Sequence, residues 1–438
     1  MKQTTHHVIP HILERAILVS LVTQKEKRNE FLTEYSLQEL VALAETAGVQ
    51  VLETMTQNKD AKDSKTFIGK GKVAELKLRL EELDGNTAIF DQELSGAQVR
   101  NLEAALDVKI IDRTQLILDI FAQRANTREG ILQVELAQLS YLLPRLSGQG
   151  KNLARLNGGG IGARGPGETK LEMDRRHIRD RIDELKQQMQ EVVRHRVLHR
   201  ERRKKAGAFQ VALVGYTNAG KSTILNQLTH ADVYVQNQLF ATLDPTSRNL
   251  KLPNGKEIIL TDTVGFIQNL PHDLIASFRA TLEEVLEADL ILHVVDSSLE
   301  MHMEQMNIVN AVLKELGARD KEQITLFNKS DLCVTTEGQM DAAEGEFLRI
   351  SAFNEADLEL IKLAIQEKLV SDSKWFRIPA NKGDLIALLY RVGEVLETDV
   401  DGDDMLIQVR VNAGDYAKNA YLLATYEDNG QVEEGATV

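Results

Sequence analysis

One stretch of the sequence decides the fold: Gly215-Tyr216-Thr217-Asn218-Ala219-Gly220-Lys221-Ser222. It follows the short apolar run Phe209–Val214 and leads into an apolar helical pattern, so it stands at a strand-to-helix turn. The pattern G-x-x-x-x-G-K-[ST] in this context predicts a phosphate-binding loop, because glycines let the backbone wrap around an anion at a helix N-terminus. Lys221 is expected to reach the β- and γ-phosphates, and Ser222 to ligate Mg²⁺. Thr223 completes the predicted phosphate site.

Two further motifs follow in the order that a nucleotide site requires. Asp262-Thr263-Val264-Gly265 comes after a strand that ends at Thr261, and we expect Asp262 to hold magnesium and the Gly265 amide to sense the γ-phosphate. Asn328-Lys329-Ser330-Asp331 follows the strand Ile324–Phe327. The Asp331 carboxylate can accept from guanine N1–H and the exocyclic amine, which adenine does not present, so the motif selects GTP over ATP. Ser351-Ala352-Phe353 is predicted to cap the base.

A first switch segment is predicted between these motifs. The segment Leu239–Thr246 contains Thr242, the best candidate for the hydroxyl that closes on magnesium, with Thr246 as runner-up. Phe240 and Ala241 are expected to line the nucleotide beside it. Phe266 stands where Ras-like enzymes place a water-orienting glutamine, so intrinsic hydrolysis should be slow. We therefore hypothesise that Asn218 helps to hold a potassium ion, with ordinary loop hydrogen bonding as the alternative.

The rest of the chain divides into modules around this site. Residues 207–372 read as a doubly wound P-loop domain and residues 373–438 as a small α+β domain. Residues 1–112 alternate short strands and helices, which predicts a parallel α/β domain. Residues 113–206 hold two long helical patterns, Gln115–Leu146 and Thr169–Lys205, which we expect to pair as an antiparallel hairpin.

The glycine-rich loop at residues 148–167 joins the two hairpin helices. So many glycines cannot hold a regular element, and basic residues are interleaved among them. A flexible linker is the plain alternative, but an arginine-bearing loop on a long stalk is better explained as a probe that orders against RNA. The predicted RNA-contacting residues are Lys151, Arg155, Asn157, Gly158, Arg164, Lys170, Arg175 and Arg176.

Composition bounds the remaining possibilities. Residues 145–205 contain 17 Lys and Arg against 8 Asp and Glu, a net +9, which leaves −23 for the rest of a chain whose formal charge is −14. A polyanion contact is therefore confined to one segment. The N-terminus lacks the apolar core of a signal peptide, and a single cysteine, Cys333, fits a reducing compartment. We expect a cytoplasmic protein without a membrane span, and allow for a peripheral membrane-associated fraction.

Over nearly its whole length the sequence resembles the HflX family, which belongs to the translation-factor-related Obg–HflX group of GTPases. Besides the glycine loop, which runs into Gly167–Glu172, the resemblance is carried by Phe67–Lys72, Asp112-Arg113, Ile120–Ala125, Leu132–Ala137, Leu142–Leu146 and Phe240–Pro245. It implies a Mg²⁺-dependent GTPase that binds the 50S subunit through 23S rRNA and ribosomal proteins. It also implies that stalled or hibernating 70S ribosomes are separated into subunits under stress. A monomer is expected.

Two alternatives stay open. One is a GTPase that acts in ribosome assembly or tRNA modification. The other is an RNA remodeller whose N-terminal domain hydrolyses ATP at Gly69–Lys72, which would appear as a weaker ATPase activity; a tight turn with solvated lysines is the plainer interpretation of that segment.

Overall fold

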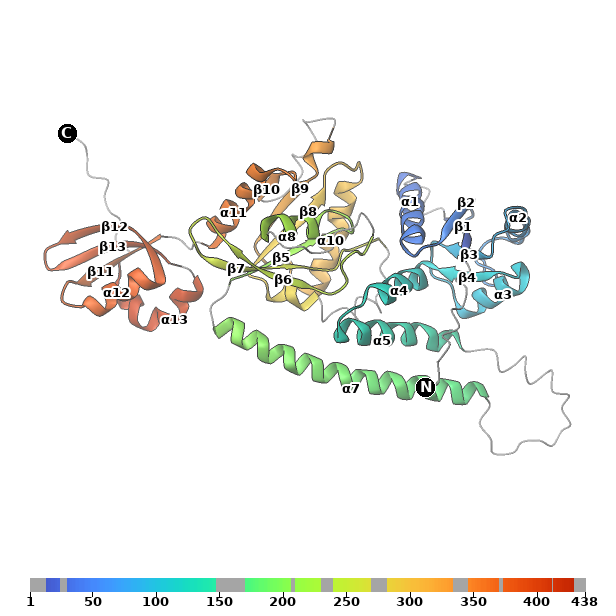
Figure 1. Ribbon diagram of the computed structural model, residues 1–438, viewed down its shortest axis with the longest axis horizontal. Helices are drawn as coiled ribbons and strands as arrows, with labels where there is room; N and C mark the ends of the chain where they lie inside the picture. Colours follow the sequence, from blue (N-terminus) through green and yellow to red (C-terminus); the bar gives the residue numbers. More distant parts are fainter. Residues whose placement is uncertain are drawn as a thin grey trace, which may run out of the picture.

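The computed structural model describes residues 13–23, 30–146, 170–205, 209–229, 239–268, 282–333, 346–369, 373–411 and 413–428 of the 438-residue chain. Within these ranges the chain forms three sheets and a long helical hairpin, which Figure 1 shows arranged along the long axis of the molecule. No helix among these residues is long and apolar enough to cross a membrane. The glycine-rich loop predicted at residues 148–167 lies outside the described residues.

The N-terminal sheet is parallel and has the strand order β2-β1-β3-β4. Its strands are β1 (Arg15–Val22), β2 (Gln50–Asn58), β3 (Thr87–Phe90) and β4 (Lys109–Asp112). The helices between them are α1 (Glu30–Thr46), α2 (Lys70–Glu82) and α3 (Gly96–Leu106). Strands β1 and β3 are almost entirely buried, as their apolar β-branched runs predict, because helices cover both faces of a parallel sheet.

The helical hairpin differs from the prediction in one respect. The segment predicted as one helix, Gln115–Leu146, is two helices: α4 (Arg113–Arg124) and α5 (Arg128–Arg145). The chain breaks between them because Thr127 adopts an extended conformation and its side chain caps the new helix by accepting from the Gly130 N–H.

The second hairpin helix is α7 (Lys170–Lys205), which has 36 residues and packs on α5. Ile182 and Leu185 are buried in this contact, and full burial of a leucine stabilises the fold by roughly 2 kcal/mol. Arg181 also donates to both carboxylate oxygens of Glu135 on α5, at 2.8 and 3.1 Å. Figure 1 shows α7 running beside both the N-terminal and the central sheet.

The central sheet has the order β10-β9-β8-β5-β7-β6, parallel except for its edge strand β6. Its strands are β5 (Gln210–Gly215), β6 (Thr246–Lys251), β7 (Glu257–Asp262), β8 (Leu290–Asp296), β9 (Gln323–Asn328) and β10 (Glu346–Arg349). The helices are α8 (Lys221–Thr229), α10 (His302–Leu316) and α11 (Glu355–Leu369). Strand order reverses direction at β5, and in such sheets ligands bind at the carboxyl ends of the strands beside this point.

The C-terminal sheet is antiparallel, with the order β12-β13-β11-β14. Its elements are β11 (Ser373–Pro379), α12 (Gly383–Val392), β12 (Gly393–Asp401), β13 (Asp404–Val411), α13 (Ala413–Leu423) and β14 (Glu427–Asp428). The predicted fold class is therefore confirmed: a parallel α/β domain with a helical hairpin, a central P-loop domain and a small α+β domain.

A single apolar cluster is continuous between the N-terminal and the central parts of the chain. It contains Leu40 and Ile117 from the N-terminal side, and Phe240 and Phe266 from the central side, all at 2% exposure or less. A continuous close-packed cluster holds two modules in a defined relation, because sliding one past the other would open cavities. The hairpin and the predicted nucleotide site are therefore mechanically joined.

Candidate nucleotide-binding site

The phosphate side of the site is the turn between β5 and α8. Gly215 and Gly220 have φ values of +155° and +98°, in the region that favours glycine, and Asn218 lies at +61°. A Cβ on Gly220 would come within 2.3 Å of the Asn328 Nδ2. The glycines of the motif are thus needed for the curvature of the loop and for its close approach to the next motif.

Lys221 lies at the floor of this turn. Its ammonium group donates to the backbone carbonyls of Gly215 and Tyr216, at 3.1 and 2.8 Å, and the residue is only 6% exposed. Burial lowers the pKa of Lys221 to about 8, while the nearby Asp262 opposes the shift. A buried cation with carbonyl partners and one nearby carboxylate is an electrostatic site for an anion.

Three oxygen ligands predicted for magnesium meet beside Lys221. The Ser222 hydroxyl lies 2.8 Å from the Thr242 hydroxyl and donates to Asp262 Oδ2 at 2.6 Å. Asp262 is fully buried, and its Oδ1 is among the buried polar atoms of the described chain that have no hydrogen-bond partner. Burial also raises the pKa of this carboxyl, against the effect of Lys221. A buried carboxylate with a free oxygen beside two hydroxyls fits a hard divalent cation such as Mg²⁺.

The runner-up for the switch hydroxyl lies elsewhere. Thr246 is the first residue of β6 and pairs with Asp262 across the sheet. The structure therefore brings Thr242, and not Thr246, against Ser222.

The base side of the site is organised by Asn328. Its Nδ2 donates to the carbonyl of Ala219 at 2.9 Å, and its Oδ1 accepts from the Ala352 N–H at 3.0 Å. One amide thus ties the phosphate loop to the loop after β10. Asp331 is exposed at the rim of the pocket, and Phe353 is 76% exposed beside it. An available carboxylate next to an open aromatic face is suited to a purine that carries N–H donors.

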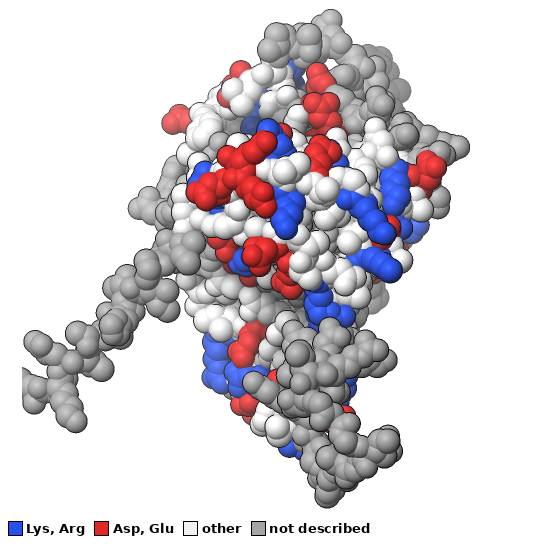
Figure 2. Space-filling view, turned by 90° about the vertical axis from the view of Figure 1, so that its right-hand side faces the viewer, with Lys and Arg blue, Asp and Glu red and all other residues white. Residues whose placement is uncertain are grey.

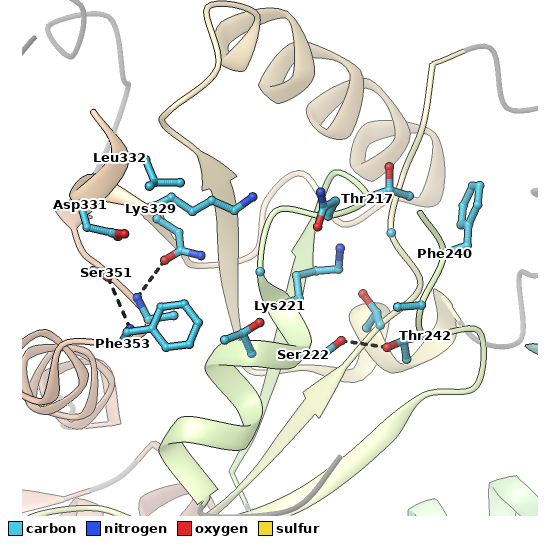
Figure 3. Close-up of a pocket in the computed structure, with 18 residues that line it drawn as sticks. Thr217, Lys221, Ser222, Phe240, Thr242, Lys329, Asp331, Leu332, Ser351 and Phe353 are labelled. Atoms are coloured by element: carbon cyan, nitrogen blue, oxygen red, sulfur yellow. Dashed lines mark hydrogen bonds between the residues drawn. The ribbon is translucent and has the colours of Figure 1, made fainter. Parts of the chain in front are cut away.

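These two sides enclose one pocket of about 300 Å³. Figure 3 shows Lys221, Ser222 and Thr242 on its phosphate side and Asp331 and Phe353 on its base side. The remaining lining residues are Thr217, Asn218, Gly220, Thr223, Phe240, Ala241, Thr263, Gly265, Asn328, Lys329, Leu332, Ser351 and Ala352. Leu332 is the lining residue that the sequence did not single out; its place, one position after Asp331, was the available signal.

Some of the predicted residues are not among those that line the pocket. They are Gly215, Tyr216, Ala219, Asp262, Val264 and Ser330. Tyr216 points away from the pocket: its hydroxyl donates to Glu39 of α1 and accepts from the Gln268 N–H at 2.7 Å. Glu39 in turn pairs with Arg113, which also binds Asp91 at 2.8 Å. These groups are buried and ionic, so they fix the phosphate loop against the N-terminal sheet.

Phe266 is buried and contributes its backbone instead of its ring. Its N–H donates to the Gly215 carbonyl at 3.1 Å, and its carbonyl accepts from the Thr217 N–H at 2.8 Å. The segment after Gly265 is therefore paired with the phosphate loop. Gly265 must be small here, because a Cβ would meet the Thr217 backbone at 2.8 Å.

The predicted RNA-contacting residues separate into two groups. Lys151, Arg155, Asn157, Gly158 and Arg164 lie outside the described residues. Lys170, Arg175 and Arg176 fall in the first turns of α7, with Arg176 exposed and Arg175 half-buried. All three belong to the N-terminal end of α7, which lies beneath the N-terminal domain and away from the central sheet (Figure 1).

The phosphate loop, a magnesium-type oxygen cluster and a carboxylate for guanine, all at the carboxyl edge of one parallel sheet, define a P-loop GTPase. Models described as "GTP-binding GTPase N-terminal", "GTP-binding GTPase Middle Region" and "50S ribosome-binding GTPase" match residues 34–122, 124–203 and 210–329. The chain belongs to the GTPase HflX family.

Relatives named GTPase HflX are similar over most of the chain. The one from Caldanaerobacter subterraneus subsp. tengcongensis is 49% identical over 91% of both chains. The one from Escherichia coli K12 is 41% identical over 92% of this chain and 95% of its own. A crystal structure of a GTP-binding protein from Sulfolobus solfataricus in complex with GDP covers 81% of this chain and 98% of its own, with 22% identity and a TM-score of 0.43.

Proposed function

We propose that this GTPase binds the large ribosomal subunit and, coupled to GTP binding and hydrolysis, dissociates stalled or hibernating 70S ribosomes into subunits under stress. The observation that carries the proposal is the junction of a GTP site with a basic helical hairpin. The family relatives of the protein and the family model described as "50S ribosome-binding GTPase" support the ribosome as the partner. We expect the protein to act as a monomer in the cytoplasm.

The pocket suggests how hydrolysis proceeds. We infer that Lys221 neutralises the β- and γ-phosphates and that the Gly265 amide holds the γ-phosphate. Ser222, Thr242 and Asp262 would hold magnesium, which supplies charge neutralisation on the phosphates when bound. The Phe266 ring cannot orient water, so we propose that intrinsic turnover is slow and that the bound partner completes the site. Asp331 selects guanine.

We further propose that Asn218 helps to hold a potassium ion beside the phosphates. Asn218 lines the pocket, and its backbone is left-handed, with a φ of +61°. A monovalent cation there would supply the positive charge that other GTPases take from an arginine. Hydrolysis should be faster in potassium than in sodium buffer at equal ionic strength, and equal rates would remove this role.

The hairpin is the best candidate for the RNA-binding element. Helix α7 carries 13 Lys and Arg against 7 Asp and Glu, whereas the chain as a whole is acidic. Basic side chains on one helix lower the free energy of binding to phosphate backbones by releasing counterions. The face formed by the N-terminal domain offers no such asymmetry: Figure 2 shows acidic and basic side chains intermingled over its coloured part.

The deciding experiment is sedimentation of 70S ribosomes with the protein and GTP, run beside a GTP hydrolysis assay with and without 50S subunits. We expect loss of the 70S peak and stimulated hydrolysis. The test variant is Arg175→Ala with Arg176→Ala, on α7. The matched control is Lys65→Ala with Lys77→Ala, which removes two exposed charges from the N-terminal domain.

The outcomes separate the possibilities. Ribosome splitting that weakens in the α7 variant and survives in the control supports the proposal. Stimulation by precursor particles or tRNA, with intact 70S ribosomes, would instead favour a role in ribosome assembly or tRNA modification. Splitting by both variants at the wild-type rate would show that Arg175 and Arg176 are not needed for it, and the predicted RNA contact of these two residues would be wrong.

A further inference from the structure

The switch segment from Phe240 to Asp244 is held from outside the central sheet. Phe240 has a φ of +53°, which is strained for a residue with a side chain. Its ring packs edge-on against Phe121 of α4, with centroids 4.6 Å apart, and both rings are almost fully buried. Packing of this kind can hold a backbone conformation that the segment would not adopt alone.

Asp244 forms the second anchor, two residues beyond Thr242. Its carboxylate accepts from the N–H groups of Asn126 and Thr127, at 3.1 and 2.9 Å, and from the Thr127 hydroxyl. These donors form the N-terminus of α5, where the helix presents its positive end. Because the acceptor is ionised, each bond is stronger than one between neutral groups.

Gly130 in the first turn of α5 is shaped to this contact. A Cβ on Gly130 would come within 2.4 Å of Asp244 Oδ1. Glycine is otherwise unfavourable inside a helix, by roughly 1 kcal/mol relative to alanine. The close approach of the carboxylate thus explains a glycine where helix propensity alone favours another residue.

Thr242 lies between the two anchors, and its hydroxyl is 2.8 Å from that of Ser222. Phe240, two residues before it, is fixed to α4, and Asp244, two residues after it, is fixed to α5. A segment pinned on both sides has few conformations to lose when Thr242 closes on a cation, so closure costs less entropy.

We propose that Asp244, held by the N-terminus of α5, is a positioning residue that places Thr242 in the magnesium site of the GTP-bound state. The hairpin therefore takes part in the nucleotide site without touching the nucleotide. By the same linkage, closure of the switch on GTP favours docking of α5, and docking of α5 favours GTP over GDP. This inference rests on the proposed magnesium role of Thr242 and not on the identity of the partner.

The test compares affinities for a non-hydrolysable GTP analogue and for GDP, together with the single-turnover rate of hydrolysis and its Mg²⁺ dependence. Asp244→Ala should weaken binding of the analogue about tenfold and leave GDP binding within about twofold, since charge-assisted hydrogen bonds are worth that much. The rate should fall by a similar factor, and more Mg²⁺ should be needed for half the maximal rate. Asp244→Asn keeps one carbonyl acceptor, so its affinity for the analogue should lie between those of the wild type and Asp244→Ala.

Gly130→Ala tests the same contact from the hairpin side. It leaves every residue of the central domain unchanged and raises helix propensity, yet its methyl group must displace the Asp244 carboxylate. We expect the same loss of preference for GTP over GDP, a few-fold in size. The matched control is Gly71→Ala in α2, where a Cβ meets nothing within 4 Å.

Thr242→Ala provides the reference. If it lowers analogue affinity while Asp244→Ala and Gly130→Ala do not, the positioning role of Asp244 is wrong and the role of Thr242 stands. If Thr242→Ala itself has no effect, both are wrong. If Asp244→Ala weakens GDP and the analogue equally, the contact is only structural and the proposal is overturned.

Discussion

The N-terminal and the central sheet of this protein each place glycine and lysine at the start of a helix, but the two turns use their backbone amides differently. In the N-terminal sheet, the Gly69 N–H donates to the Gln57 side chain at 2.8 Å, and the Asp63 and Phe67 backbones pair with each other. In the central sheet, the turn surrounds a pocket, and the lysine lies at its floor. Glycine and lysine alone therefore do not make a phosphate site. The backbone N–H groups of the turn must also be left free by the protein's own side chains.

Lys221→Ala should give the largest difference between the two turns. Removal of the buried ammonium leaves the phosphate charge without its nearest partner, and we expect single-turnover GTP hydrolysis to fall about 10²–10³-fold. A rate within tenfold of the wild type would mean that another cation serves the phosphates.

Gly220→Ala should have the next largest effect. The new methyl group would lie 2.3 Å from Asn328 Nδ2 at a backbone φ of +98°, so both the loop and the bridge to Ala352 must shift. We expect GDP affinity to fall about tenfold, which strain of roughly 1–3 kcal/mol would produce. Titration with a fluorescent GDP measures it. Unchanged affinity would show that the loop opens without loss of the pocket.

His293 makes the central sheet sensitive to acid. It is 1% exposed on β8, and burial, with a smaller effect from Lys221, lowers its pKa to about 4. The unfolded chain takes up the proton near pH 6.5, so stability is present above that pH and is lost as pH falls toward 4. Between pH 7 and 5.5 the loss should be about 1 kcal/mol. On β1 of the N-terminal sheet the buried polar residue is Ser20, whose hydroxyl does not take up a proton in this pH range.

The measurement is thermal unfolding at both pH values. His293→Leu should unfold with a smaller difference between pH 7 and pH 5.5 than the wild type. An equal pH dependence in the two proteins would mean that other groups set the acid sensitivity.

The smallest effect is expected from Lys70→Ala combined with Lys72→Ala. Lys72 already pairs with Glu75 at 2.7 Å, and the turn before it is filled by Gln57. We expect ATP and GTP hydrolysis to remain within about twofold of the wild type, because a surface ion pair contributes little. A selective loss of ATP hydrolysis would assign a second nucleotide site to the N-terminal sheet.

Most residues that the sequence predicted for the phosphate loop and its neighbours line one pocket in the structure, because phosphate chemistry restricts a short, contiguous stretch of residues. The sequence predicted less of the structure where a local feature depends on a residue far away along the chain. The break between α4 and α5 is stabilised by Asp244, more than a hundred residues later, and helical spacing before it gives no sign of that partner. Strand β6 was missed because its polar residues, at a sheet edge, form no apolar run.

The orientation of the Tyr216 side chain is a second feature that the sequence did not predict. Its position inside the phosphate motif predicted a contact with nucleotide, but its hydroxyl binds Glu39 in another domain. Motif spacing describes the backbone of the loop and does not report which side chains the loop turns outward. Only the packing of the two domains settles that.

The length of α7 has a mechanical consequence. A continuous helix of 36 residues is roughly 54 Å long, and Arg196, about three quarters of the way along it, lies 3.5 Å from Glu283 in the central domain. A straight rod of that length converts each degree of tilt at one end into roughly 1 Å of travel at the other. A tilt of about three degrees would therefore move the distant end of α7 by roughly the length of a hydrogen bond.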